Sequence, residues 1–161
     1  MTKFEEMGFT PGILKSIQEL GFENPMPVQE KVIPLMLGDD RDIIALAQTG
    51  TGKTAAFGLP LVLATNPEIN SPQALILCPT RELCIQITGD LHDYSKHTAS
   101  LRILAVYGGS SIENQIRELK KGVHIIVATP GRLIDLIGRR AAKLNNVHTV
   151  ILDEADEMLN M

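Results

Sequence analysis

The residues with the clearest chemical meaning form a glycine-rich loop over Ala47–Thr54, AQTGTGKT. The loop follows an apolar run and precedes a stretch with a helical pattern. Backbone N–H groups at such a helix start bind phosphate oxygens, the ammonium of Lys53 adds a positive charge, and the Thr54 hydroxyl suits Mg²⁺. The loop therefore predicts a nucleotide site, the alternative being a glycine-rich turn without ligand. The residues of this predicted site are Thr49, Gly50, Thr51, Gly52, Lys53 and Thr54.

Two acidic residues, Asp153 and Glu154, follow the apolar run Val150–Leu152 and stand 100 residues after Lys53. Open α/β sheets bind ligands at the carboxyl ends of their strands, so this pair is placed for metal and water chemistry. We expect Asp153 to hold Mg²⁺, usually through water, and Glu154 to orient or deprotonate an attacking water. The alternative is a solvated helix N-terminus, where the dipole favours acidic residues. Together with the loop, the pair predicts an ATP site with Lys53, Asp153 and Glu154 as catalytic residues.

Length and composition indicate one compact α/β domain, since the 161 residues are 44% hydrophobic and can build a core. The net charge of −4 gives no bulk signature of a nucleic-acid binder, so any such binding must come from local groups. Cys78 and Cys84 lack the spacing of a zinc site or a disulfide framework, and we expect buried free thiols in a reducing cytoplasm. No apolar run approaches the ~18 residues of a membrane span, and the N-terminus MTKFEEMGF lacks a signal-peptide core. We expect a soluble cytoplasmic protein that has no membrane partner.

Short apolar runs alternate with stretches of helical pattern, and the runs are too uniformly apolar for burial of one face only. This alternation predicts buried parallel strands that are joined through helices. The predicted strands are Ile43–Ala47, Ala74–Cys78, Ile103–Tyr107, His124–Ala128 and Val150–Leu152. The predicted helices are Pro11–Leu20, Val28–Leu37, Lys53–Ala64, Arg81–Lys96, Ile112–Lys121 and Pro130–Arg139.

Several predicted helices carry capping residues at their starts. Thr10 and Thr129 each precede a proline, which predicts an N-cap hydroxyl before the first helical residue. Ser110 and Glu113 have the spacing of a capping box. Pro60 lies inside a predicted helix, and its missing N–H is expected to kink or shorten that helix.

From Phe4 to Met161 the chain resembles the N-terminal RecA-like half of the DEAD-box ATP-dependent RNA helicases, and Leu152–Met161 looks most like bacterial members. The resemblance rests on the glycine-rich loop, on Asp153–Asp156, DEAD, and on Gly21–Gln29, GFENPMPVQ. It implies the fold of a RecA-like P-loop NTPase, a three-layer sandwich with a mainly parallel central sheet. It also implies ATP and Mg²⁺ as cofactors.

The resemblance assigns roles to residues that composition alone does not single out. It implies that Gln29 reads the edge of adenine, a task that suits an amide because it offers a donor and an acceptor. Phe4 matches an upstream aromatic residue that stacks on the base in this family, and Asp156 is implied in coupling between domains. Met26 stands where the family usually has threonine, so the local hydrogen bond of that hydroxyl is not expected here.

Three further segments follow predicted strands: Pro79–Leu83, Gly108–Gly109 and Thr129–Arg132. Helix N-termini and exposed glycine N–H groups favour anions, and Arg81 and Arg132 could add charge-assisted contacts. Taken singly, each segment could be simple helix capping. The resemblance implies that together they hold the backbone of single-stranded RNA or a short duplex without reading its sequence. The implied RNA-binding residues are Pro79, Thr80, Arg81, Gly108, Gly109, Thr129, Pro130, Gly131 and Arg132.

The resemblance implies further parts: a Ser-Ala-Thr strand between the loop strand and the Asp-Glu strand, a linker and a second RecA-like domain. None of them is in the sequence, so we expect a truncated form of a longer protein, with an empty slot in its sheet and unpaired backbone groups. The second domain of the natural chain is an expected partner. Because it normally supplies an arginine finger worth about 10³–10⁵ in rate, these residues alone are expected to bind ATP weakly and to turn over slowly.

Other functions share parts of this pattern. A small-molecule kinase or a GTPase would also use the loop, but a guanine-reading Asn-Lys-x-Asp is absent, and Gln29 with Phe4 suits adenine. DNA helicases share the phosphate chemistry, whereas Asp153–Asp156 and the Gln29 motif favour RNA. A nucleotide-gated RNA or protein clamp without catalysis is the remaining alternative. The leading prediction is RNA-dependent ATP hydrolysis coupled to local duplex unwinding or to remodelling of ribonucleoprotein.

Overall fold

The computed structural model describes residues 3–38, 40–48, 50–98 and 100–161. Their contacts divide the chain into two compact units. The loop unit is Met1–Ala64 with Asp90–Ser100, and the sheet unit is Thr65–Gly89 with Leu101–Met161. Thr49 of the predicted nucleotide site lies outside the described residues.

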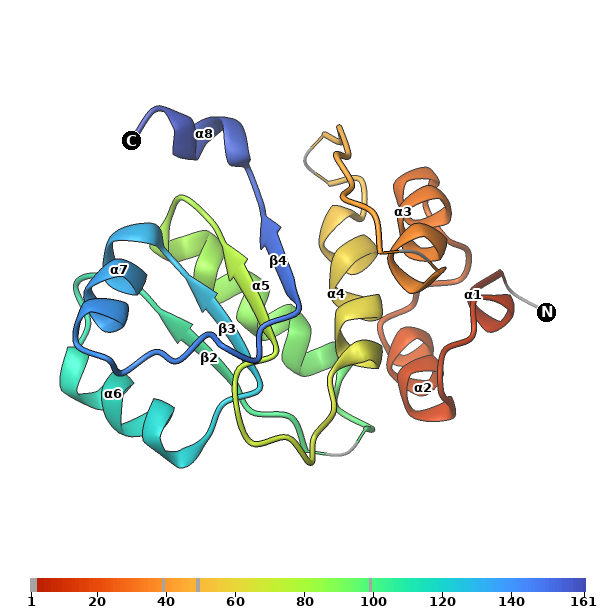
Figure 1. The fold of residues 1–161 in the computed structure, drawn as a ribbon. Helices are drawn as coiled ribbons and strands as arrows, with labels where there is room; N and C mark the ends of the chain where they lie inside the picture. The colour runs from red at the N-terminus through yellow and green to blue at the C-terminus, as the bar shows by residue number, and fades with distance from the viewer. Residues whose placement is uncertain (1–2, 39, 49, 99) are drawn as a thin grey trace. The chain divides into compact units, whose positions relative to one another are not determined.

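The described part of the loop unit contains helices and no strand (Figure 1). The helices predicted from apolar pattern are confirmed here, with ends that differ by at most one residue for α2, α3 and α4. Helix α1 was not predicted, because four residues are too few to show a helical period. The helices are α1 (Lys3–Glu6), α2 (Pro11–Glu19), α3 (Pro27–Gly38), α4 (Lys53–Ala64) and the C-terminal end of α5 (Arg81–Tyr94).

Helix α4 continues through Pro60 to Ala64, so this proline does not shorten the helix, whereas the alternative of a kink stays a prediction. Every residue from Ala55 to Val62 is buried. This burial holds the helical path although Pro60 cannot donate a hydrogen bond to the preceding turn. Gly58 permits a close approach in the same unit, because a Cβ at this position would lie 2.8 Å from Cε2 of Tyr94. The body of α4 is therefore firmly packed, and Lys53 is its first residue.

The sheet unit is built on four parallel strands in the order β2-β3-β1-β4 (Figure 1). Four of the five predicted strands are confirmed, each with its ends shifted by no more than one residue. Helix α8, which follows the acidic pair, was not predicted. The elements are β1 (Ala74–Leu77), β2 (Ile103–Val106), α6 (Ile112–Lys121), β3 (Ile125–Ala128), α7 (Pro130–Gly138), β4 (Thr149–Leu152) and α8 (Ala155–Leu159).

The structure contradicts the strand predicted over Ile43–Ala47, which forms no strand. Ile44 and Leu46 are 93% and 95% exposed. A strand needs a neighbour for its backbone N–H and C=O groups, and no described segment pairs with this run. Strand β4 lies at one edge of the sheet, and its Val150 and Leu152 are more than half exposed. Apolar composition thus identified the run but could not supply its partner.

The strand register aligns the carboxyl ends of all four strands. Leu77 is level with Ala128 of β3 and with Leu152 of β4, and Ala128 is level with Val106 of β2. Because all pairs are parallel, the segments that follow these four residues leave the sheet at the same edge. We call it the carboxyl edge. It receives each predicted functional segment of the sheet unit.

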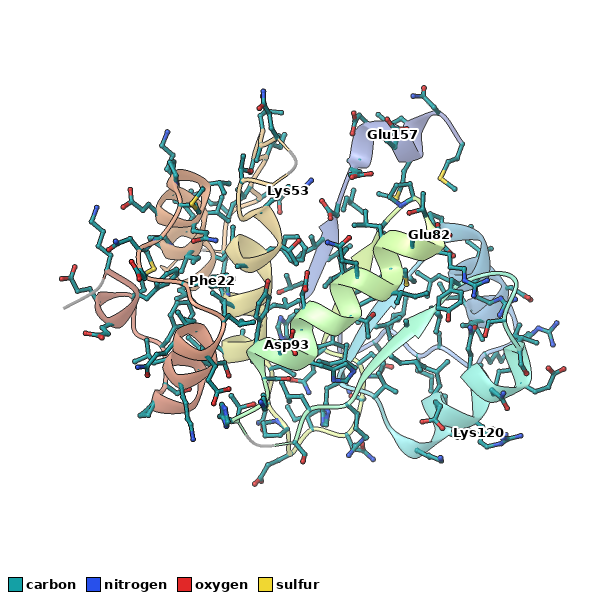
Figure 2. All side chains as sticks on the ribbon, turned by 180° about the vertical axis from the view of Figure 1, so that it is seen from behind. Phe22, Lys53, Glu82, Asp93, Lys120 and Glu157 are labelled. Atoms are coloured by element: carbon teal, nitrogen blue, oxygen red, sulfur yellow. The ribbon has the colours of Figure 1, made fainter. Side chains whose placement is uncertain are left out.

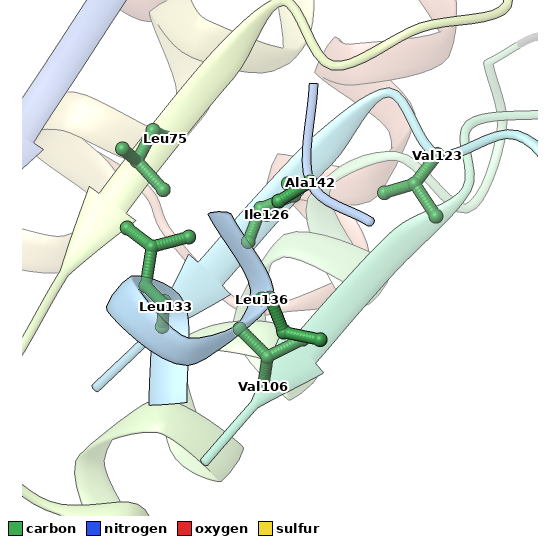
Figure 3. Close-up of a cluster of buried hydrophobic side chains, with 8 residues drawn as sticks. Leu75, Val106, Val123, Ile126, Leu133, Leu136 and Ala142 are labelled. Carbon is green, nitrogen blue, oxygen red and sulfur yellow. The ribbon is translucent and has the colours of Figure 1, made fainter. Parts of the chain in front are cut away.

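The sheet unit has three layers. Strand residues alternate between faces, and Leu75 and Ile126 point to the face where they pack with Leu133 of α7 (Figure 3). Apolar residues of α6 pack against the same cluster. The first half of α5 covers the opposite face, where the Cys84 thiol lies 3.0 Å from the carbonyl oxygen of Val127. The predicted three-layer arrangement around a parallel sheet is confirmed for this unit.

Helix starts differ from two of the predicted caps. Thr10 caps α2 as predicted, through a long hydrogen bond of 3.5 Å from the Ile13 N–H to its hydroxyl. Thr129 occupies the N-cap position of α7, but its hydroxyl makes no capping hydrogen bond. The cap of α6 is Ser111 and not Ser110, because Ser111 Oγ accepts from the Asn114 N–H at 3.3 Å. The capping-box spacing from Ser110 to Glu113 therefore pointed one residue too early, and Ser111 Oγ instead lies 3.3 Å from Glu113 Oε2.

A buried histidine anchors the end of the sheet opposite the carboxyl edge. His124 is fully buried, its Nδ1 accepts from the Arg102 N–H at 2.9 Å, and its Nε2 lies 2.9 Å from the Pro67 carbonyl oxygen. These partners require a neutral ring with its proton on Nε2. Burial, aided by the charge of Arg102 and opposed by the Pro67 hydrogen bond, lowers the pKa of His124 below its ordinary value of 6.5.

The lowered pKa predicts an acid-sensitive stability. Below pH 6.5 the unfolded chain takes up a proton at His124 before the folded chain does, so the free energy of unfolding falls as the pH drops through the folded pKa. One such group contributes a slope of at most about 1.4 kcal/mol per pH unit. Urea unfolding measured at pH values from about 7.5 to about 5 gives the free energy of unfolding across this range. This free energy should fall less steeply with decreasing pH in His124→Gln than in the parent protein. Equal slopes for the two proteins would contradict this assignment.

Candidate functional site

The glycine-rich loop has the backbone conformation that a phosphate site requires. Gly50 and Gly52 have φ angles of +80° and +82°, which residues with a Cβ rarely adopt. The Thr51 hydroxyl donates to the Gln48 carbonyl at 2.5 Å and closes the turn. Lys53 then begins α4, at the loop end of that helix in Figure 2. The first turn of α4 contains no acidic residue, so its N–H groups and the Lys53 ammonium favour an anion.

Gln29 of α3 is tied to this loop. Its side chain is buried, Oε1 accepts from the Met26 N–H at 2.9 Å, and Nε2 donates to the Gly52 carbonyl at 3.1 Å. An amide has two N–H groups and two lone pairs on oxygen, so one of each remains for a ligand. A Cβ at Gly52 would collide with Gln29 Nε2. The sequence suggested only an adenine contact for Gln29, and the structure adds a link between the Gly21–Gln29 motif and the phosphate loop.

Phe4, the predicted base-stacking residue, is 1% exposed in α1. Its ring is therefore a core side chain of the loop unit in this structure, and its contact with a base stays a prediction. Helix α1 is also fastened at its surface, where Lys3 Nζ lies 2.6 Å from Glu30 Oε1 of α3. The sequence does not by itself show whether this aromatic side chain is buried in the core or free to stack on a base.

The acidic pair lies on the carboxyl edge, as predicted. Asp153 is 4% exposed, and its N–H donates to the Leu77 carbonyl at 2.9 Å, which continues the β1–β4 pairing by one step. The carboxylate lies near Cys78: a hydrogen bond with Cys84, burial and the Asp153 charge together raise the pKa of the Cys78 thiol. Both cysteines are free and buried, as predicted. Aspartate side chains are seldom fully buried, so this burial is unusual for the residue type, and the role of Asp153 as a metal ligand stays a prediction.

Glu154 turns the chain sharply after Asp153. Its φ and ψ angles are 53° and 50°, a left-handed conformation, and it occupies the N-cap position of α8 without a side-chain capping hydrogen bond. A residue with a Cβ in this region carries strain, which is found more often at functional sites than elsewhere. Asp156 is exposed in the first turn of α8. Glu154 does stand at the N-terminus of a helix, as the alternative without a ligand predicted. A solvated helix N-terminus does not, however, account for the burial of Asp153.

The oxygen donors of the candidate site suit Mg²⁺. Thr54 offers a half-buried hydroxyl in the loop unit, and Asp153 offers a buried carboxylate in the sheet unit. Within the described residues no group of three or more His, Cys, Asp or Glu side chains could hold a metal ion. Mg²⁺ is commonly held by one or two protein oxygens together with water and phosphate, so the Thr54 hydroxyl and the Asp153 carboxylate each have, taken singly, the chemistry of a ligand for this ion.

The first segment predicted to bind RNA, Pro79–Leu83, leads from β1 into α5 at the carboxyl edge. The Thr80 hydroxyl accepts from the Leu83 N–H at 3.1 Å and so caps the helix. Arg81 is exposed, and its guanidinium carbon lies 5.2 Å from the centre of the Tyr107 ring. This cation–π contact holds the Arg81 head group next to the glycine turn that follows β2. Pro79 is half-buried between the strand and the helix.

The other two segments are joined by a hydrogen-bond network. Arg132 Nη1 donates to the Ser110 carbonyl at 3.0 Å and to Gln115 Oε1 at 2.9 Å. Gln115 Nε2 donates to the Tyr107 carbonyl at 3.2 Å. Gly108 and Gly109 between these contacts are exposed. Of the predicted RNA residues that precede Arg132, Thr129 and Pro130 are half-buried and Gly131 is exposed.

Sequence reasoning missed Tyr107 and Gln115. Tyr107 was read only as the last residue of a strand. Gln115 had a signal, because α6 places apolar residues at Ile112, Ile116 and Leu119, and Gln115 is a buried polar residue among them. A polar residue on the apolar stripe of a helix predicts a buried hydrogen-bonding partner.

In the part of the chain that the structure describes, no helix has the length and the apolar character needed to cross a membrane.

Comparison with curated proteins identifies relatives over the whole chain. The DEAD/DEAH box helicase family matches residues 26–161. The ATP-dependent RNA helicase CshA of Listeria monocytogenes serovar 1/2a is 56% identical, over 100% of this chain and 31% of that protein. The DEAD-box ATP-dependent RNA helicase CshA of Geobacillus kaustophilus is 52% identical, over 100% of this chain and 34% of that protein. The chain thus spans about a third of the length of these relatives.

Solved structures of similar fold point to the same family as the sequence relatives. A DEAD box protein from the hyperthermophile Methanococcus jannaschii superposes with a TM-score of 0.93 at 47% identity, over 98% of this chain and 43% of that chain. Dbp5 of S. cerevisiae, bound to RNA and ADP BeF3, superposes with a TM-score of 0.89 at 38% identity, over 98% of this chain and 39% of that chain. These neighbours confirm the RecA-like α/β fold, and the family match covers the loop, the acidic pair and the whole carboxyl edge. The chain therefore belongs to the DEAD/DEAH box helicase family.

Proposed function

We propose that this chain is the ATP-binding and RNA-binding half of an ATP-dependent RNA helicase, which couples ATP hydrolysis to local duplex unwinding or to remodelling of ribonucleoprotein. The observation that supports the proposal is the parallel register of the sheet, which brings the acidic pair and the three segments predicted to bind anions to one edge. Relatives named as ATP-dependent RNA helicases, and a neighbour bound to RNA and ADP BeF3, support both ligands.

The nucleotide site is proposed to combine the loop with the acidic pair. Backbone N–H groups of Thr49–Thr54 and the Lys53 ammonium would hold phosphate oxygens, and Thr54 and Asp153 would hold Mg²⁺. Bound Mg²⁺ would supply positive charge to the phosphates. Glu154 would accept a proton from the attacking water or orient it, which favours an enzyme over a clamp without catalysis.

The proposal also covers recognition of the adenine base and a second domain. The remaining donor and acceptor of Gln29 would read adenine, and Phe4 would contact the base. We propose that a second RecA-like domain of the natural chain faces this site, with Asp156 in the coupling between the domains. These residues alone would then bind ATP weakly and hydrolyse it slowly. A cytoplasmic location is proposed on the ground of the two free thiols.

The carboxyl edge is proposed to hold the RNA backbone. Gly108, Gly109 and Gly131 are exposed and bring backbone N–H groups close to the surface, while Arg81 offers a positive charge. Pro79, Thr80, Thr129, Pro130 and Arg132 would shape the same surface. Contacts of this kind address phosphate and 2′-hydroxyl groups and not base edges, so binding would be independent of sequence.

Two substitutions separate nucleotide binding from hydrolysis. Lys53→Ala removes a charge-assisted phosphate contact and should weaken ATP binding by about tenfold or more, since such contacts contribute about 1.5–3 kcal/mol. Glu154→Gln keeps the size of the side chain but cannot take a proton, so it should retain ATP binding and lose about 10²–10⁴-fold of RNA-stimulated hydrolysis. Titration with a fluorescent ATP analogue and a phosphate-release assay measure the two effects. Full hydrolysis by Glu154→Gln would refute the proposed base.

The link between Gln29 and the loop gives a second prediction. Gly52→Ala places a Cβ against Gln29 Nε2 at a φ of +82°, so it should disturb the loop and weaken ATP binding about tenfold. Gly8→Ala is the matched control, because Gly8 also has a positive φ but a Cβ there meets nothing within 4 Å. The control should lose stability without losing nucleotide affinity in the same titration. Equal ATP affinities for the two variants would show that contact with Gln29 does not shape the loop.

A further inference from the structure

Gln115 connects two of the segments at the carboxyl edge. It is 5% exposed, it projects from α6, and each end of its amide is used. The N–H end binds the carbonyl of Tyr107, just before the glycine turn, and the oxygen end binds Arg132 Nη1. Arg132 Nη1 also binds the carbonyl of Ser110, just after the turn. The exposed turn Gly108–Gly109 is therefore held on both sides by one buried amide and one guanidinium.

The same network reaches Arg81 on another helix. The backbone of Tyr107 is held by Gln115, and the Tyr107 ring lies under the Arg81 guanidinium at 5.2 Å. A Cβ added at Gly109 would lie 3.7 Å from Arg81 Nη1, so the turn and this charged group are neighbours. Because the ring position depends on the Tyr107 backbone, a change at Gln115 is transmitted to Arg81 through two contacts.

The chemistry of the amide explains why this position is polar. The other inward residues of α6 are apolar, and an apolar residue would fill the space without hydrogen bonds. It would, however, leave the Tyr107 carbonyl and one N–H of Arg132 without their present partner. Glutamine is neutral, so it orients two groups of opposite polarity without adding a charge to a surface that binds an anion.

We propose that Gln115 is a positioning residue for RNA phosphate binding. It holds the glycine turn and the guanidinium groups of Arg81 and Arg132 in fixed positions relative to one another. This inference rests on the proposed function, because it needs the carboxyl edge to bind RNA. Gln115 itself touches no phosphate. Arg132 acts in part in the same way, since its Nη1 is engaged within the protein.

The test measures RNA affinity against salt concentration for the natural polypeptide that contains this sequence. The probe is a labelled polyuridylate oligonucleotide in the presence of a non-hydrolysable ATP analogue. Loss of one phosphate contact to single-stranded nucleic acid lowers the slope of log K against log[salt] by about 0.7. Gln115→Met keeps the size of the side chain and removes the hydrogen bonds without changing the charge. It should weaken RNA binding about tenfold and lower the slope by about 0.7, and Arg81→Met is expected to lower the slope by the same amount.

Gln18→Met is the matched control, because Gln18 is an exposed residue of α2. It should keep the affinity and the slope of the parent protein. ATP affinity without RNA should be unchanged in Gln115→Met. If Gln115→Met does not fold, Gln115→Glu tests the same link, since it can still accept from Arg132 but places a carboxylate oxygen against the Tyr107 carbonyl. RNA affinity should again fall.

The outcomes separate the two proposals. The positioning role would be overturned if the parent protein binds RNA and Gln115→Met leaves the slope of log K against log[salt] unchanged. If only Gln115→Glu folds, an unchanged slope in that variant would overturn it in the same way. Lower thermal stability with an unchanged slope would show a purely structural residue and would also overturn it. Absence of RNA binding by the parent protein itself would refute the proposed function. A slope that falls in Gln115→Met, but falls no further in the double variant with Arg81→Met, would support action through Arg81.

Discussion

The parallel hydrogen-bond register of β2, β3, β1 and β4 determines where the polar segments of the sheet unit lie. Every strand runs in the same direction, and the last residues of neighbouring strands are level. The residues after each strand are freed from the ladder at one edge, where their N–H groups and side chains can face a ligand. Asp153, the glycine turn and the starts of α5 and α7 meet there for this reason. No local property of those four segments would bring them together.

Buried glutamine side chains hold the loops that connect the strands and helices. Gln29 fastens the phosphate loop to α3, and Gln115 fastens the glycine turn to α6. Gln73 holds the turn over Asn66–Ile69 through both its oxygen and its nitrogen, at the opposite end of the sheet. An amide can do this because it donates and accepts without a charge, so its burial costs less than that of an ion. In each case the amide satisfies backbone groups of a segment that has no ladder of its own.

The exposed apolar residues show what happens when a segment has no partner. Ile43–Ala47 has the composition of a buried strand and forms none, and Val150 and Leu152 face solvent from the edge strand β4. Strand pairing is a property of two segments, so composition predicts only the capacity for it. The described residues contain no strand that pairs with this run or with the free side of β4. The helix that follows the loop, by contrast, forms as predicted, because its hydrogen bonds are internal and its face is buried.

The sequence by itself determined the family resemblance, the candidate site residues and most of the helices and strands. Periodicity placed the helices because a helix satisfies its backbone locally, and Lys53 and Asp153 stood out because their neighbours define a loop and a strand end. The tertiary structure decided which polar side chains are tied together. Gln29 to Gly52, Gln115 to Tyr107 and the burial of Phe4 each join residues from separate elements. It also decided which predicted strand remained unpaired, since such pairings depend on packing and register, which no single segment encodes.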